Sequence, residues 1–139
     1  MISRIYSIAL FFLLLACSQQ ESSKETSNSD AVVSQTISAA EFQSKISATK
    51  DPIVLDVRTP GEYASGYIEG AINLDFREAD FSKKIDELDK EATYFVYCGS
   101  GRRSRGALDL MKELKFKNVY DLEGGISQWR ASDFPIKQP

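Results

Sequence analysis

The stretch from Tyr94 to Ser104 constrains the fold of this chain more than any other part of the sequence. Residues 94–97 are all apolar or aromatic, which predicts a short buried strand. Beyond a loop with two glycines, apolar residues recur at the spacing of one helix face, which predicts a helix over 104–116 that buries Ala107, Leu110, Met111 and Leu114. Cys98 therefore lies where a strand ends and a loop leads into a helix, the place where ligands bind in open α/β sheets.

The composition of this loop favours an ionised thiol at Cys98. Gly99 and Gly101 have no Cβ, so the backbone amides of the loop can approach an anion closely. A helix N-terminus and nearby arginines lower the pKa of a cysteine from its usual value of about 8.5, and arginines occupy positions 102, 103 and 105. The pattern indicates a site for a small anion or an anionic sulfur. The alternative is that Cys98 is a small buried hydrophobe and that the arginines form a solvated face.

Strand patterns alternate with helix patterns along the rest of the chain. Ser38 and Thr59 each stand three residues before a glutamate, the pattern of a helix capping box. Further strands are expected at 53–56, 71–74 and 119–122, and further helices at 81–88 and after Gly124. This alternation predicts one α/β domain, a parallel sheet covered by helices on both faces.

The N-terminal segment resembles a bacterial lipoprotein signal peptide. Residues 1–16 place Arg4 before an apolar run that is too short to span a bilayer, and the run ends in Leu14-Leu15-Ala16-Cys17, which resembles a lipobox. The resemblance implies cleavage before Cys17, lipid on that cysteine and an anchor in the bacterial cell envelope, and Ser18 favours the periplasmic face of the outer membrane. An ordinary cleaved signal and an uncleaved anchor are the alternatives.

The segment that follows separates the anchor from the folded domain. Residues 18–36 are polar and rich in serine, which predicts a flexible tether over 17–36 and a domain over 37–136. If Cys17 carries lipid, Cys98 is the remaining thiol and no internal disulfide can form. The chain has no histidine, which excludes a histidine general base and a zinc site with histidine ligands, and we expect no cofactor or metal. A net charge of −3 does not suggest nucleic acid as a partner.

Four motifs, in their order and spacing, resemble those of a single-domain rhodanese. They are Asp56-Val-Arg58, Glu62-Tyr63-Ala-x-Gly66-Tyr-Ile68-x-Gly70-Ala-Ile72-Asn73, Cys98-x-x-Gly101-x-Arg103-Ser104 and Gly124-Gly125-Ile-x-x-Trp129. The resemblance covers roughly residues 38–135. It implies a five-stranded, mostly parallel sheet flanked by helices, and transfer of sulfur from thiosulfate or another anionic sulfane donor to a thiol or cyanide.

The resemblance also implies roles for single residues. Cys98 would be the nucleophile that carries the sulfur as a persulfide. The persulfide would be held by the backbone amides of the loop Gly99, Ser100, Gly101, Arg102, Arg103 and Ser104. Arg103 matches the fixed arginine of the family, with a structural ion pair as the alternative, and Arg102 is expected to help bind an anionic donor. Tyr67 departs from the pattern, because the family often has histidine there.

Two further questions stay open at the level of the sequence. Asp56 and Arg58 either line the pocket or are structural, with Arg58 paired to Glu62 so that the turn is fixed, and we favour the structural role. Trp129 either walls the pocket or belongs to the core, and we favour the core.

Two other functions compete with sulfur transfer by turnover. A cysteine phosphatase or arsenate reductase has a similar loop, but its arginine stands six positions after the cysteine, whereas Arg103 stands five after Cys98. A persulfide carrier or binding module with little turnover would use the same loop, together with a periplasmic redox or sulfur-relay protein.

Overall fold

The structure of the protein, a computed structural model, describes residues 32–139. Strands and helices alternate along the described part of the chain. In order they are β1 (Val33–Ile37), α1 (Ala39–Ala48), β2 (Ile53–Asp56), α2 (Pro60–Ala64), β3 (Ile72–Asn73), α3 (Phe81–Asp86), β4 (Thr93–Tyr97), α4 (Arg102–Glu113), β5 (Asn118–Leu122) and α5 (Gly125–Ala131).

The strands form one five-stranded sheet in the order β1-β5-β4-β2-β3, and each neighbouring pair is parallel. The predicted α/β fold is thereby confirmed. β4 lies in the middle of the sheet, with Val96 opposite Leu55 of β2 on one side and Asp121 of β5 on the other. The loop after β4 therefore opens at the carboxyl edge of the sheet, between the ends of β2 and β5.

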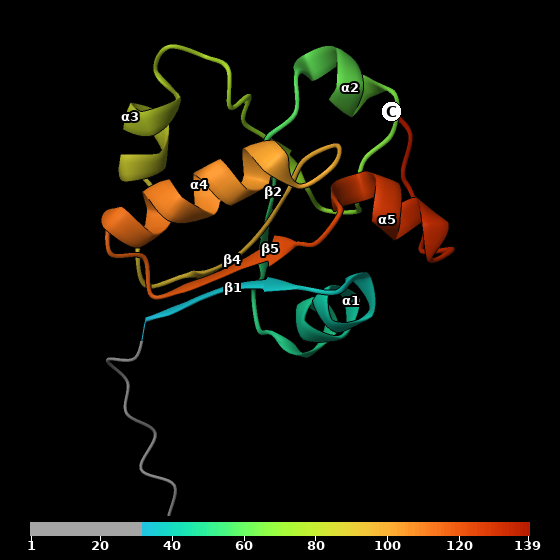
Figure 1. Ribbon diagram of the computed structural model, residues 1–139, viewed down its shortest axis with the longest axis horizontal. Coiled ribbons are helices and arrows are strands. Elements are labelled where there is room, and N and C mark those ends of the chain that lie inside the picture. The colour runs from blue at the N-terminus through green and yellow to red at the C-terminus, as the bar shows by residue number, and fades with distance from the viewer. Residues whose placement is uncertain (1–31) are drawn as a thin grey trace, which may run out of the picture.

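Helices cover both faces of the sheet, with α3 and α4 on one side and α1 and α5 on the other (Figure 1). Consecutive side chains of a strand point to opposite faces, so β4 contributes to two separate cores. Tyr94, Val96 and Cys98 pack on the side of α3 and α4. Phe95 and Tyr97 pack on the side of α1 and α5. A strand buried on both faces explains why the sequence shows a continuous apolar run here.

The first strand corrects the predicted boundary between tether and domain. The tether was expected to continue to residue 36, but β1 begins at Val33 and pairs with β5 from Asn118 to Leu122. β1 is an edge strand, and Gln35 and Thr36 are exposed. Because half of its side chains face solvent, the composition of β1 resembles that of the polar segment before it. The alternation of apolar and polar residues covers too few positions to predict a strand.

Helix starts follow the capping signals. Thr59, the residue before α2, and Glu62 in its first turn form a complete capping box, and Ser38 Oγ accepts a hydrogen bond from the Glu41 amide of α1. α4 begins at Arg102, two residues before the predicted start. Arg102 and Arg103 therefore belong to the first helical turn, directly behind the loop.

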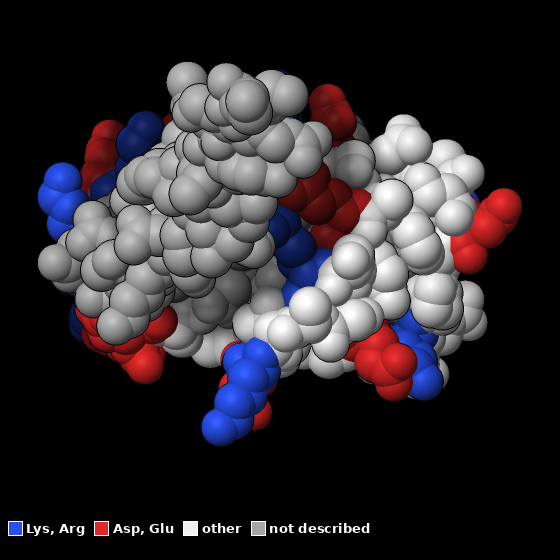
Figure 2. All heavy atoms as spheres, turned by 90° about the horizontal axis from the view of Figure 1, so that it is seen from below, with Lys and Arg blue, Asp and Glu red and all other residues white. Residues whose placement is uncertain are grey.

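The surface carries charges of both signs. On the face shown in Figure 2, acidic and basic side chains of the described residues lie in small mixed groups, and neither sign covers a continuous area. Among residues 32–139, no helix combines the length and the apolar character needed to cross a membrane.

Candidate active site

Cys98 lies at the carboxyl end of β4 and is almost fully buried, with 1% of its surface exposed. Its Sγ accepts a hydrogen bond from the Gly101 amide at 3.1 Å and from the Ser104 hydroxyl at 3.6 Å. The αL conformation of Gly101, with φ of 94°, ends the loop and starts α4. Glycine is suited to this backbone conformation, and the turn directs successive amides toward the sulfur.

The surroundings of Cys98 act on the thiol in opposite directions. Burial is the largest influence and raises the pKa of the thiol, because it disfavours the charged form. Hydrogen bonds from the Ser104 side chain and from the backbone amides of Ser104, Ser100 and Gly101 act the other way. The hydrogen bonds win, so the pKa of Cys98 lies below its usual value. The site therefore favours a thiolate, which is the nucleophilic form of cysteine.

The N-terminal turn of α5 holds the first part of the loop. The Ile126 amide donates to the Cys98 carbonyl at 2.8 Å, and the Ser127 amide and hydroxyl donate to the Gly99 carbonyl at 3.2 and 2.9 Å. A Cβ at Gly125 would come within 2.4 Å of the Cys98 carbonyl oxygen. The close approach of α5 thus requires glycine at 125, and it keeps the loop carbonyls turned away from the sulfur.

Arg103 is tied to the helix that follows β2. Its two terminal nitrogens donate to the two carboxylate oxygens of Glu62 at 2.8 and 2.6 Å, and Thr59 also donates to Glu62. The hydrogen bond from Arg103 is the main cause that lowers the pKa of Glu62 to about 2. Arg103 also lies close enough to Cys98 for the anionic sulfur to contribute to the raised pKa of the guanidinium. Arg103 therefore has the structural ion pair that the sequence left open, and it adds positive charge beside the sulfur.

Asp56 and Arg58 form a buried ion pair with each other. Arg58 Nε lies 2.9 Å from Asp56 Oδ1 and Arg58 Nη2 lies 2.5 Å from Asp56 Oδ2, and Nη2 also donates to the Gly66 carbonyl at 2.8 Å. The predicted pair between Arg58 and Glu62 is wrong, because Glu62 is bound to Arg103. Both members of the pair are buried, at 0% and 2% exposure, which matches the structural role that we favoured.

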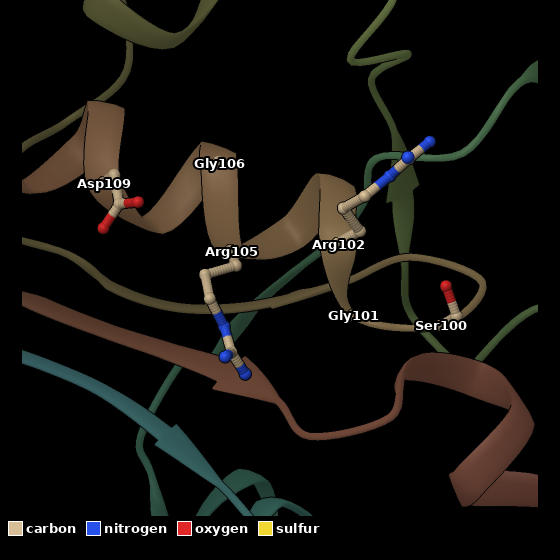
Figure 3. A pocket seen from close by; sticks show the side chains of 6 residues that line it. All are labelled: Ser100, Gly101, Arg102, Arg105, Gly106 and Asp109. Carbon is tan, nitrogen blue, oxygen red and sulfur yellow. The ribbon is translucent and has the colours of Figure 1, made fainter.

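Arg102 is exposed. It lines a surface hollow of about 520 Å³ together with Ser100, Gly101, Arg105, Gly106 and Asp109. Figure 3 shows that Arg102 and Arg105 leave α4 in different directions, and Arg105 points toward β5. The hollow adjoins the outside of the Cys98 loop, and Cys98 is not among its lining residues.

Two aromatic residues of the motifs have structural positions. Trp129 is 1% exposed, packs on Phe42 and Phe134 and donates from its indole to the Pro135 carbonyl, so it belongs to the core as we favoured. Tyr67, at the position where histidine was noted as frequent, stacks on Tyr63 with ring centroids 4.3 Å apart.

The sequence did not predict the contacts of two acidic residues of this region. Glu62 was assigned to the capping box and, as one alternative, to a pair with Arg58, whereas its ion pair with Arg103 was missed. Asp121 lies within strand β5 and is fully buried. Its place between the apolar residues of a predicted strand was the sequence signal that could have marked it as a buried charge. No group of three acidic, cysteine or histidine side chains in residues 32–139 is arranged to hold a metal ion.

Comparisons with known proteins agree with this geometry. The family described as "Rhodanese-like domain" matches residues 38–132. A sulfurtransferase of Allochromatium vinosum is 30% identical over 103 residues, which are 74% of this chain and 94% of the relative. The thiosulfate sulfurtransferase GlpE of Pseudomonas entomophila is 38% identical over 81 residues, which are 58% of this chain and 72% of the relative.

Solved structures show the same fold. The crystal structure of a rhodanese-related protein from Thermoplasma volcanium matches with a TM-score of 0.67 at 31% sequence identity, over 76% of this chain and 99% of that one. Its sheet and helices therefore correspond to nearly the whole of the described domain. From its fold, its Cys98 loop and the match of residues 38–132, this chain belongs to the rhodanese-like domain family.

Proposed function

We propose that this protein is a sulfurtransferase that moves sulfane sulfur from thiosulfate, or a related anionic donor, to a thiol or cyanide through a persulfide on Cys98. The observation that carries the proposal is the Cys98 sulfur itself. It accepts hydrogen bonds from Gly101 and Ser104, its thiol pKa is lowered, and it lies at a loop that leads into a helix N-terminus. A nucleophile with a depressed pKa beside positive charge is suited to covalent catalysis.

The reaction has two steps that balance in atoms and charge. The Cys98 thiolate attacks the outer sulfur of thiosulfate, a new S–S bond forms, and the old S–S bond breaks so that sulfite leaves with its electron pair. The acceptor then attacks the terminal sulfur of the persulfide, and Cys98 leaves again as a thiolate. The amide of Gly101 and the hydroxyl of Ser104 stabilise the anion, and Arg103 supplies positive charge nearby.

The geometry favours sulfur over phosphate as the group that is transferred. The arginine of the loop stands five residues after Cys98, and its guanidinium is engaged by both oxygens of Glu62. A phosphatase needs a guanidinium free to bind a tetrahedral anion. The compact loop, whose amides converge on one sulfur, fits a persulfide better.

Thiocyanate formation from thiosulfate and cyanide tests the enzymatic part. We expect turnover with the native protein and none with Cys98→Ser, whose fold should remain intact by circular dichroism. If the protein takes up sulfur from thiosulfate but forms no thiocyanate, the function is that of a persulfide carrier that hands sulfur to a partner protein. If Cys98→Ser keeps its turnover, the proposed mechanism is wrong.

We further propose that the domain is held at the periplasmic face of the outer membrane by lipid on Cys17. The support is the lipobox-like sequence at 14–17 followed by Ser18, which lies outside the described residues. We expect the full-length protein to fractionate with outer membranes, and Cys17→Ser to be released into the soluble periplasmic fraction. An unchanged distribution of Cys17→Ser would contradict the lipid anchor.

A further inference from the structure

The arginines around the Cys98 loop fall into two groups. Arg58 and Arg103 are each held by both oxygens of a carboxylate. Arg102 forms no ion pair within residues 32–139, and Arg105 contacts a carboxylate oxygen there only at 3.7 Å. A guanidinium presents five N–H donors in a planar fork that matches a carboxylate. Arg102 and Arg105 therefore have donors that are available to a ligand.

Both of these arginines line the surface hollow of about 520 Å³ on α4. Their side chains leave the helix in different directions, so they flank the hollow from two sides (Figure 3). Ser100 and Gly101 of the Cys98 loop lie at one end of it, and Asp109 lies about two helical turns further along α4. The volume is within the usual range of sites for small molecules.

The hollow and the sulfur site share a wall. Gly101 lines the hollow, and its amide donates to Cys98 Sγ at 3.1 Å. Cys98 itself does not line the hollow, so a molecule bound there keeps its charged group away from the reacting sulfur. Thiosulfate carries its sulfonate directly on the sulfur that Cys98 attacks, so its charge stays at the sulfur site. The hollow therefore suits a longer substrate than thiosulfate.

We propose that the sulfur acceptor is a small thiol with a carboxylate several bonds from its sulfur, and that Arg102 and Arg105 bind this carboxylate in the hollow. The proposal rests on the sulfur-transfer function and names the substrate class of its second step. The acceptor thiolate attacks the terminal sulfur of the Cys98 persulfide, and a new S–S bond forms. The bond to Cys98 breaks with its electron pair on Cys98, and the acceptor leaves as a persulfide.

The charges along α4 place the carboxylate near the start of the helix. Asp121 is fully buried, and its Oδ2 lies 3.7 Å from Nε of Arg105, whose side chain is 57% exposed. This contact orients the guanidinium and leaves its terminal nitrogens to a ligand. Asp109 repels a carboxylate at the far end of the hollow, whereas the helix dipole favours one beside Arg102.

Sulfur transfer from the loaded full chain to a matched pair of thiols tests the proposal. Mercaptohexanoate and mercaptohexanol have the same chain and differ in a charge that is remote from the sulfur. The protein is loaded with thiosulfate and freed of excess donor, and loss of sulfur from the Cys98 peptide is followed at low thiol concentration. We expect faster transfer to mercaptohexanoate, and we expect the ratio of the two rate constants to fall as salt is added.

Single substitutions on α4 identify the residues that cause the preference. Arg102→Gln and Arg105→Gln should each lower the ratio, by up to about fivefold, which is the range of an exposed ion pair. Asp109→Asn should raise it. Lys112→Gln is the matched control, because Lys112 is exposed on α4 outside the hollow and loses the same charge, and it should keep the native ratio. A change in the reactivity of Cys98 alone alters both rate constants equally and leaves the ratio as it was.

Three results would overturn the proposal. The first is a native protein with no preference for mercaptohexanoate. The second is a preference that Arg102→Gln and Arg105→Gln both leave unchanged, and the third is an equal loss in Lys112→Gln, which would reduce the effect to the overall charge of α4. A protein that takes up no sulfur would overturn the proposed function together with this inference, whereas uptake without any preference would overturn this inference alone.

Discussion

At Cys98, two opposing effects on one side chain decide its chemistry. Cys98 is almost fully buried, and burial raises the pKa of a thiol. If burial were the only influence, Cys98 would stay protonated and behave as an unreactive hydrophobic residue. Hydrogen bonds from Ser104, Ser100 and Gly101 reverse the sign of the shift. Cys98 is therefore a buried sulfur whose thiolate form is nevertheless favoured.

Glu62 gives a prediction at the level of one residue. Its pKa is lowered from 4.5 to about 2 by Arg103, so its contribution to stability is complete above pH 4.5 and is lost as the pH falls toward 2. Glutamine at this position keeps the capping role and removes the charge. We therefore expect Glu62→Gln to lower the free energy of unfolding at pH 6 and to have little effect near pH 2, as measured by urea unfolding at several pH values.

The size of this effect is limited by solvent. The Glu62 side chain is 38% exposed, so screening keeps the expected loss within about 1 kcal/mol. Glu41→Gln is the matched control, because Glu41 has the same position in α1 and its nearest lysine is 3.9 Å away. An equal pH dependence in both variants would contradict the special role of the Arg103 pair.

At the level of elements, the site is made by three segments that meet at the end of β4. The loop after β4 supplies the sulfur, α4 supplies Ser104 and Arg103, and α5 holds the loop carbonyls through Ile126 and Ser127. The contact with α5 is possible only because Gly125 has no side chain. The shape of the Cys98 loop therefore depends on a glycine that is 27 residues away from Cys98 in the sequence.

Gly125→Ala is expected to disturb both stability and reactivity. Gly125 has φ of 60°, and a Cβ there would meet the backbone of Cys98 and Gly99 at 2.4 and 2.7 Å. We expect a loss of at least about 2 kcal/mol in urea unfolding, together with slower alkylation of Cys98. Gly61→Ala in α2 is the control, since nothing lies within 4 Å of its Cβ, and it should be neutral or stabilise by about 0.4–1 kcal/mol. Equal stability of the two variants would contradict the packing of α5 on the loop.

The sequence predicts elements here better than it predicts partners. Buried strands such as β4 and the apolar face of α4 have periodic patterns, and the capping signals at Ser38 and Thr59 correctly mark helix starts. β1 is missed because an edge strand alternates over few residues and half of them are polar. Glu62 pairs with Arg103, and Arg58 pairs with Asp56 instead. The pairing of Glu62 depends on how α2 and α4 are placed relative to each other, and no local sequence pattern contains that information.

At the level of the whole molecule, β1 completes the domain. It adds the fifth strand, buries Ile37 in the core beside α1 and α5, and brings Thr36 to the Asp121 carboxyl. A domain that began at Ser38 would keep all four family motifs but would lose these contacts. The residues before the recognisable motifs therefore contribute to the stability of the site behind Cys98.

A shortened chain tests the role of β1. We expect residues 38–139 to unfold at a lower urea concentration than residues 32–139, because loss of the burial of Ile37 alone costs about 1.5–3 kcal/mol. The longer chain with Thr36→Val separates the hydrogen bond to Asp121 from the loss of the strand. Identical unfolding midpoints for the two lengths would show that β1 is dispensable.

The most direct test of the account is the intact mass of the protein before and after exposure to thiosulfate. We predict a gain of one sulfur atom, located on the peptide that contains Cys98, removed by cyanide and absent in Cys98→Ser. A native protein that gains no sulfur from thiosulfate or from other sulfane donors, or a Cys98→Ser variant that still gains it, would contradict the assignment of Cys98 as the sulfur carrier.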